Sequence, residues 1–187
     1  IEQVPGLTVD EGQGSLLGRW QASRLQWQGY GINLDLQQPL LDWSPSCLFE
    51  KRLCVDTLHA QSMDLETAPS SNGTEPASGF ALPVVDIPLA LEISDVRIGA
   101  FTVNGSLVWD RFELDAGGSG ASWQLERVHY QLADYAVTAR GRVETRGDCP
   151  VDLEAIATLP PPRGDQWEIE VNLAGSIEDL RLEGRSR

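Results

Sequence analysis

Apolar and polar residues alternate along much of this chain with a period of two. The clearest examples are residues 30–37 and 167–173, where apolar residues occupy every second position. In the second segment Ile169 and Val171 are separated by Glu170. Because successive side chains of a β-strand point to opposite faces, this alternation predicts strands with one apolar and one solvated face. Such strands are typical of antiparallel sheets.

Turn sequences separate the predicted strands at short intervals, so helical crossovers of a dozen residues have no room. The turns are Gln28-Gly29, Asn104-Gly105, Gly117-Gly118, Arg146-Gly147-Asp148 and Gly175-Ser176. We therefore expect an all-β protein built as an elongated antiparallel meander. Between Trp109 and Phe112 the apolar positions switch from odd to even numbers, which predicts a bulge or bend and hence a curved sheet.

One short helix is expected near residues 45–51, and it should be one or two turns long. Ser44 is a residue that can cap the first amide groups, and Pro45 suits the first helical position.

The chain divides into three stretches by composition. Residues 68–80 are rich in Pro, Gly and Ser and lack residues of the buried type until Phe80, so they are predicted to form a mobile loop. On this basis residues 1–67 form an N-terminal β segment with the short helix, and residues 81–187 continue the sheet. We expect all three to belong to one continuous structural unit.

A weak internal repeat of about 15 to 20 residues accompanies this rhythm. It is visible in residues 101–109 and again in residues 171–177, each of which contains a strand and a Gly turn. A unit of this size cannot bury its apolar face alone, so neighbouring units must align and share one apolar surface. The predicted shape is therefore elongated.

Charge excludes one class of partner. The chain has 28 acidic against 14 basic residues and a formal charge of −14, which repels the phosphates of nucleic acids and anionic lipid head groups alike, so nucleic acid is a poor partner. No stretch reaches the roughly 18 apolar residues that a membrane span needs. Since the chain opens with Ile1 and no signal-like segment follows, we expect any export signal or membrane anchor to lie upstream.

Two of the three cysteines lie close together in the sequence. Cys47 and Cys54 flank a predicted turn, whereas Cys149 stands alone. Short-range pairs form readily in oxidising compartments, so a Cys47–Cys54 disulfide is one interpretation, and two buried free thiols are the other.

No arrangement of residues in the sequence points to catalysis. His59 and His129 lie on the polar positions of predicted strands, and neither a nucleophile motif nor a metal-ligand cluster accompanies them. We therefore expect no enzyme activity, no cofactor and no metal. Six tryptophans could form a platform for sugars, but most fall on apolar positions, which favours packing. They are Trp20, Trp27, Trp43, Trp109, Trp123 and Trp167.

A series of short motifs in a fixed order suggests a family. The series begins with Gly12-x-Gly14-Ser15-Leu16-Leu17-Gly18-x-Trp20, continues with Leu41-Asp42-Trp43-x-Pro45 and Leu53-Cys54-Val55-Asp56-Thr57-Leu58, and restarts at residues 82–99 after the Pro-rich break. In this order the motifs resemble the opening of the TamB family of translocation and assembly proteins, and AsmA-like relatives share several of them. The resemblance covers about Gly6 to about Trp109.

The resemblance implies a fold, a location and partners. The fold would be a curved sheet forming an open groove, called a β-taco, with an apolar lining. The chain would be a periplasmic segment of an inner-membrane-anchored protein of a Gram-negative bacterium. It would cooperate with a TamA-like outer-membrane barrel, and its roles would be phospholipid movement and outer-membrane biogenesis.

A physical mechanism follows if the groove is open: its apolar side chains would solvate phospholipid acyl chains while head groups remain in water. The predicted lining is Ile32, Leu34, Leu36, Leu107, Trp109, Ile169 and Val171. Two other interpretations stay open: a scaffold for outer-membrane protein assembly by strand addition, and a carbohydrate-binding β-sandwich. A closed sandwich and an open groove share the same alternation.

Overall fold

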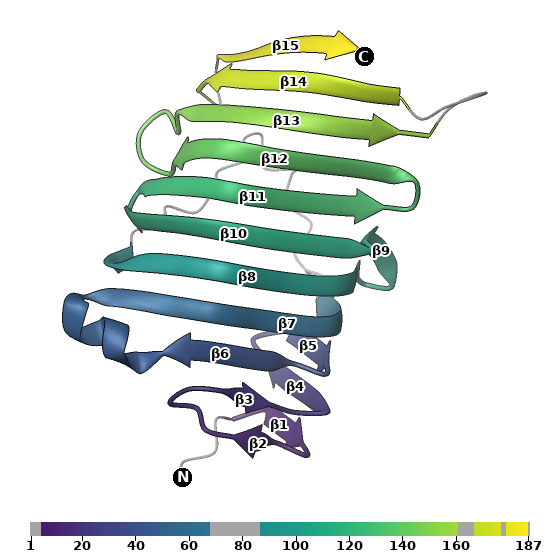
Figure 1. Ribbon diagram of the computed structural model, residues 1–187. Helices are drawn as coiled ribbons and strands as arrows, with labels where there is room; N and C mark the ends of the chain where they lie inside the picture. The colour runs from purple at the N-terminus through teal and green to yellow at the C-terminus, as the bar shows by residue number, and fades with distance from the viewer. Residues whose placement is uncertain (1–4, 68–86, 161–166, 177–178, 187) are drawn as a thin grey trace.

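The computed structural model describes residues 5–67, 87–160, 167–176 and 179–186. Within them the chain forms a single sheet of 15 strands (Figure 1). The strands are β1 (Leu7–Asp10), β2 (Gln13–Gly14), β3 (Trp20–Gln21), β4 (Arg24–Gly29), β5 (Ile32–Gln37), β6 (Leu40–Ser44), β7 (Arg52–Thr67), β8 (Ile87–Val103), β9 (Ser106–Trp109), β10 (Arg111–Gly120), β11 (Ser122–Leu132), β12 (Tyr135–Glu144), β13 (Val151–Leu159), β14 (Trp167–Gly175) and β15 (Leu180–Ser186).

Most neighbouring strands are antiparallel, as the alternation predicts, and β10 to β15 form a meander in chain order. Most of the predicted turns are present. Between β8 and β9, for example, Asn104 and Gly105 have φ values of 50° and 76°. Asn and Gly tolerate this left-handed conformation best, and it matches the twist of a tight hairpin. The turn predicted at Gly117-Gly118 is wrong: both glycines lie within β10, opposite Gln124 and Trp123, and the chain turns at Ala121.

The order of strands departs from a meander at the centre of the sheet. There β7 and β8 pair in parallel, with Arg52 opposite Ala90 and Leu65 opposite Val103. Parallel neighbours need a connection of a dozen or more residues, and residues 68–86 stand between these two strands in the sequence. The predicted loop 68–80 lies outside the described residues.

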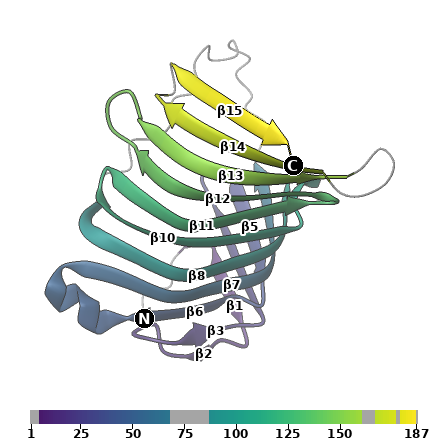
Figure 2. The same ribbon diagram turned by 45° about the horizontal axis from the view of Figure 1, so that its top comes forward.

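Strands β7 and β8 bend, and the bend divides the sheet into two walls. The second half of β7 pairs with β5, so that Leu36 lies opposite Met63, whereas the first half pairs with β6, so that Leu41 lies opposite Leu58. We call β1, β4, β5, β9 and the second halves of β7 and β8 the short wall. The remaining strands form the long wall. Figure 2 shows β1, β4 and β5 running behind the long wall and across its strands.

Bulges and one close backbone approach accompany the bend. Register shifts interrupt the pairing of β6 with β7, of β8 with β9 and β10, of β10 with β11, and of β11 with β12. At Gly99 a Cβ atom would lie only 2.0 Å from the backbone oxygen of Gln61. The bend predicted between Trp109 and Phe112 is present, because β9 ends at Trp109 and β10 begins at Arg111.

The predicted helix is a single 3₁₀ segment, η1 (Pro45–Glu50). A disulfide joins its Cys47 to Cys54 at the start of β7, with 6.0 Å between the Cα atoms. The disulfide interpretation of these cysteines is therefore confirmed. The expected cap by Ser44 is wrong: its hydroxyl donates a hydrogen bond to Asp56 Oδ2 at 2.7 Å and does not bond the helix amides. The bond to Asp56 turns the Ser44 hydroxyl toward the neighbouring strand, so its oxygen does not accept from a helix amide as a cap would.

Burial is modest and concentrated near the bend. In the described part of the chain no side chain has an exposed fraction below 2%. The buried residues are Ala22, Pro39, Cys54, Ala60, Val96 and Ala116. The described strands form one sheet and not the two packed sheets that a carbohydrate-binding β-sandwich would have.

Candidate functional site

The candidate site is the apolar face of the sheet, which continues from strand to strand because the register aligns apolar residues. Residues directly opposite each other on neighbouring strands share a face. One row crosses the whole long wall without a polar residue. It consists of Leu41, Leu58, Val96, Leu114, Val128, Ala139, Ala155, Val171 and Gly184.

A second row runs beside the first and is also entirely apolar. It consists of Trp43, Val55, Ile93, Ala116, Leu125, Gly141, Leu153, Leu173 and Leu182. On the short wall two further rows have the same character. They are Leu7, Trp27, Leu34, Leu65 and Val103, and Val9, Leu25, Leu36, Met63, Phe101 and Trp109.

An aromatic cluster shows that this apolar face lies on the inside of the bend. Phe101 belongs to the short wall, whereas Phe112 and Tyr130 belong to the long wall. The ring of Trp109 lies 4.4 Å from Phe101, 5.2 Å from Phe112 and 6.4 Å from Tyr130, centroid to centroid. Side chains from both walls can meet only on the concave side. We call this concave apolar face the groove.

The groove side chains are only partly covered. Val171, Leu34 and Leu36 have intermediate exposure, and Leu182 on β15, the last described strand, is 65% exposed. Packed cores of this size normally contain fully buried Leu, Ile or Phe side chains. The sheet is therefore an open groove and not a closed core.

The structure places most of the predicted lining on the groove face. Ile32, Leu34 and Leu36 lie on the short wall, and Ile169 and Val171 lie on β14 of the long wall. The two groups therefore belong to different walls and occupy different parts of the groove.

The structure does not bring Leu107 together with Trp109. An extra residue, Val108, shifts the register of β9, so Leu107 lies opposite Thr102 and Trp109 opposite Phe101. Thr102 faces the polar side, where its hydroxyl donates to Asp64. Leu107 is 47% exposed there.

Several groove residues were missed from sequence, including Phe101, Phe112 and Tyr130. Their common signal is the switch of apolar parity around Asp110, which brings aromatic residues of two walls together. The indole N–H groups of Trp109 and Trp123 are buried and have no acceptor within the described part of the chain. Such donors are uncommon in folded proteins and mark places where a bound molecule could supply an acceptor.

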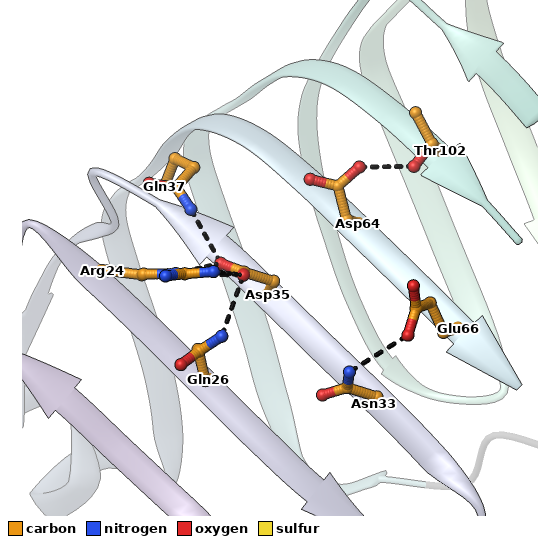
Figure 3. A network of polar contacts seen from close by, with 8 residues as sticks. All are labelled: Arg24, Gln26, Asn33, Asp35, Gln37, Asp64, Glu66 and Thr102. Atoms are coloured by element: carbon orange, nitrogen blue, oxygen red, sulfur yellow. Dashed lines mark hydrogen bonds and ion pairs between the residues drawn. The ribbon is translucent and has the colours of Figure 1, made fainter. Parts of the chain in front are cut away.

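The opposite face is polar and is held by cross-strand networks (Figure 3). Asp35 accepts hydrogen bonds from Arg24, from Gln26 at 3.1 Å and from Gln37 at 2.8 Å. The bond from Arg24 is the main cause that lowers the pKa of Asp35, and the same contact raises the pKa of Arg24. Asn33 donates to Glu66 at 3.2 Å on the same face.

Ion pairs continue this polar face along the long wall. Arg127 lies opposite Asp115 with 3.0 Å between Nη2 and Oδ2, and Arg140 lies opposite Glu154 with 2.8 Å between Nη2 and Oε2. The apolar groove and the polar, solvated exterior are therefore the two opposite faces of the same strands.

The two histidines take part in the polar face. His59 Nε2 lies 2.9 Å from Asp95 Oδ2, and His129 Nδ1 lies 3.1 Å from Thr138 Oγ1. In the ranges that the structure covers, no three His, Cys, Asp or Glu residues gather as a metal site would require.

Comparison with known protein families shows which family the chain belongs to. The family model described as TamB, N-terminal domain, matches residues 2–81 and 74–186. The chain belongs to this family. No curated protein and no solved structure matches it.

Membership of the TamB family agrees with the resemblance of the motifs and implies a membrane-associated protein. Among the described residues no helix is both long enough and apolar enough to cross a bilayer. The motif residues Gly14 and Trp20 lie opposite each other on β2 and β3, and Trp43 lies on β6, so the motifs build the first edge of the long wall.

Proposed function

We propose that this domain is a non-enzymatic periplasmic segment of a TamB-like bridge that conducts phospholipid acyl chains along the groove toward the outer membrane. One observation supports the proposal above all: apolar rows cross the long wall from β6 to β15, and their side chains are left partly uncovered. Each acyl methylene that leaves water in such a groove contributes about 0.8 kcal/mol.

The rows also suggest why lipid would move and not stay. Each step along a row replaces one small or medium apolar side chain by another, as from Ala139 to Ala155 to Val171. Near-equivalent sites have near-equal affinity, so no position holds the acyl chain much more strongly than the next. The polar face stays outside with the head groups, and the net charge of −14 offers no general site for anionic phosphates.

A photocrosslinking experiment tests the proposal in cells that express the whole protein. A benzophenone amino acid at Leu34 or Val171 should yield phospholipid adducts, whereas the same amino acid at Asn33 or Asn172 should not, because these neighbours lie on the polar face. Adducts at the polar-face positions alone, or none from folded protein, would end the proposal.

A charge substitution sharpens the test. Val171→Asp places a carboxylate beside the acyl chains, and because the groove is open the side chain still reaches water. We expect lipid adducts at Ile169, the neighbouring groove position on β14, to be lost while the melting temperature falls by only a few degrees, about 1 kcal/mol. Asn172→Asp on the same strand is the matched control and should change neither. Unfolding of Val171→Asp would indicate a closed core.

Strand addition remains a second candidate because β15 pairs with β14 alone among the described strands. Its other edge pairs with none of the described strands, and Leu180 and Leu182 are 46% and 65% exposed. The same crosslinker placed at Leu182 separates the two candidates, since strand addition would give polypeptide adducts in place of lipid adducts.

A further inference from the structure

Four exposed apolar side chains gather at one end of the long wall. Leu16 and Leu17 lie in the turn between β2 and β3, and Leu48 and Phe49 lie on η1. Their exposed fractions are 68%, 76%, 44% and 94%. Figures 1 and 2 both place η1 and this turn at the same end of the sheet. We call these four residues the apolar tip.

Hydrogen bonds hold the turn of the tip in place. Trp43 Nε1 donates to the backbone oxygen of Leu16 at 2.7 Å, which fixes the turn against the end of β6. Within the turn, the Ser15 amide donates to the Arg19 oxygen at 2.9 Å. Leu16 and Leu17 therefore belong to an ordered turn.

The short helix η1 of the tip is also fastened to the sheet. The Cys47–Cys54 disulfide fastens η1 to β7, and the Lys51 amide closes its end by donating to the Leu48 oxygen at 3.0 Å. None of the six residues of η1 is buried. Pro45 and Cys47 are half-buried against the sheet, whereas Leu48 and Phe49 point outward, and exposed apolar groups of this kind mark contact surfaces.

The tip lacks the acidic excess of the whole chain, whose formal charge is −14. Beside it Arg19, Lys51 and Arg52 balance Glu50 and the two carboxylates that contact this end, Asp56 at Ser44 and Glu92 at Arg52. Arg52 is paired with Glu50 and Glu92. Arg19 and Lys51 are exposed and make no ion pair within the described residues. Two available cations therefore flank the apolar side chains.

We infer that the apolar tip docks on the surface of a bilayer that contains anionic phospholipid. Leucine and phenylalanine side chains enter the interface between head groups and acyl chains, and Arg19 and Lys51 meet the lipid phosphates. The combination of apolar insertion and cationic flanks favours this occupant over an acidic protein surface, which would not accommodate Phe49. Trp43 belongs both to the groove row and to the base of the tip, so docking brings that end of the groove to the lipid. This inference does not depend on conduction along the groove.

Vesicle flotation of the purified 187-residue chain tests the inference. The chain should bind vesicles of phosphatidylcholine with phosphatidylglycerol and bind more weakly to phosphatidylcholine alone. Leu17→Ser with Phe49→Ser should weaken binding at least about tenfold, a readily measured difference. Tyr30→Asn is the matched control, because Tyr30 is 99% exposed on the turn between β4 and β5 of the short wall, and it should bind like the unsubstituted chain.

Further variants separate the contributions of the cationic residues and of the groove from that of the apolar tip. Arg19→Gln with Lys51→Asn should reduce binding to the anionic vesicles and leave the weak binding to phosphatidylcholine unchanged. Val171→Asp should bind vesicles normally even though it loses groove adducts, so failure of conduction and failure of docking are distinguishable. Melting temperatures confirm folding, and Phe49→Ser alone replaces the double variant if that one unfolds.

Three results would overturn the inference. They are no binding of the unsubstituted chain to anionic vesicles, binding by the folded tip variant equal to that of the unsubstituted chain, and an equal loss in Tyr30→Asn. A benzophenone amino acid at Phe49 that yields polypeptide adducts and no lipid adducts in membranes would overturn it as well.

Discussion

Strands β1 to β11 and strands β12 to β15 belong to one sheet, yet they pair differently. In the first group, which we call the bent region, four strand pairs contain a register shift. The pair of β11 with β12 at its boundary contains one as well. The second group, the flat region, pairs without any shift from β12 through β15. All six buried residues, from Ala22 to Ala116, lie in the bent region.

This difference in burial shows how a sheet of a single layer forms a core. Burial needs a second surface, and in this chain that surface is the sheet itself after it has bent. The flat region has no such partner among the described residues, so its stability rests mainly on backbone pairing between its strands. Its apolar row is consequently left partly exposed. Stability and access to the groove are thus concentrated in different regions.

The largest expected effect on stability comes from substituting Gly99 in the bent region, and Gly184 in the flat region serves as its comparison. At Gly99 an added Cβ would lie 2.0 Å from the Gln61 oxygen, whereas at Gly184 the nearest atoms are 3.9 Å away. Gly99→Val forces the backbones of β7 and β8 apart and should reduce the free energy of unfolding by about 3 kcal/mol or more. Gly184→Val should change it by less than about 1 kcal/mol. Urea denaturation checks both, and equal losses would contradict the comparison.

The disulfide gives the next largest effect. Replacing Cys47 and Cys54 by Ser removes the cross-link in the bent region and should cost about 2 to 3 kcal/mol. Cys149→Ser, in the turn between β12 and β13, should cost less than about 0.5 kcal/mol because this thiol is not cross-linked. Thermal unfolding with and without reductant measures the difference. If reductant left the melting temperature of the unsubstituted chain unchanged, the cross-link would contribute nothing.

The smallest effect concerns carboxylates on the polar face. Asp35 is 17% exposed and has three donors, and its pKa in the folded chain lies below the usual value of 3.8. A lowered folded pKa means that the stabilisation is fully present above pH 3.8 and is lost as the pH falls through the folded pKa. Asp35→Asn should therefore cost about 1 kcal/mol at pH 7, and the cost should shrink in acid.

Glu154 in the flat region serves as the control for this pH dependence. Its side chain is 64% exposed, and exposed ion pairs contribute little. Glu154→Gln should change stability by less than about 0.5 kcal/mol at any pH between 3 and 7. A pH dependence of Glu154→Gln as large as that of Asp35→Asn would show that the two regions do not differ electrostatically.

Local patterns in the sequence predicted what depends on neighbours in the chain. Alternation in residues 30–37 and 167–173 gave strands with one apolar face, and the parity switch near Asp110 gave the bend. The spacing of Cys47 and Cys54 was sufficient for the disulfide interpretation. Each of these features is determined within about ten residues, the range over which turn and strand preferences act.

Features that depend on distant partners were not predictable in this way. The parallel pairing of β7 with β8 leaves no trace in the alternation, because a strand has the same pattern whichever neighbour it meets. Leu107 was assigned to the lining with Trp109 by parity, yet one extra residue in the bulge puts it opposite Thr102. Ser44 meets Asp56 of β7, a partner that only the folded sheet supplies.

The parallel seam between β7 and β8 has a kinetic consequence. In a hairpin such as β10–β11 the first contacts close a loop of a few residues, whereas each contact across the seam joins residues 38 positions apart, as Asp64 and Thr102 show. The entropy lost on closing a loop grows with its length, and non-local pairing slows folding. The hairpins on either side can form independently and early, so completion of the seam is the step that commits the chain to its native topology. We therefore expect substitutions along the seam, at Gly99 among others, to slow the assembly of the sheet as well as to lower its final stability.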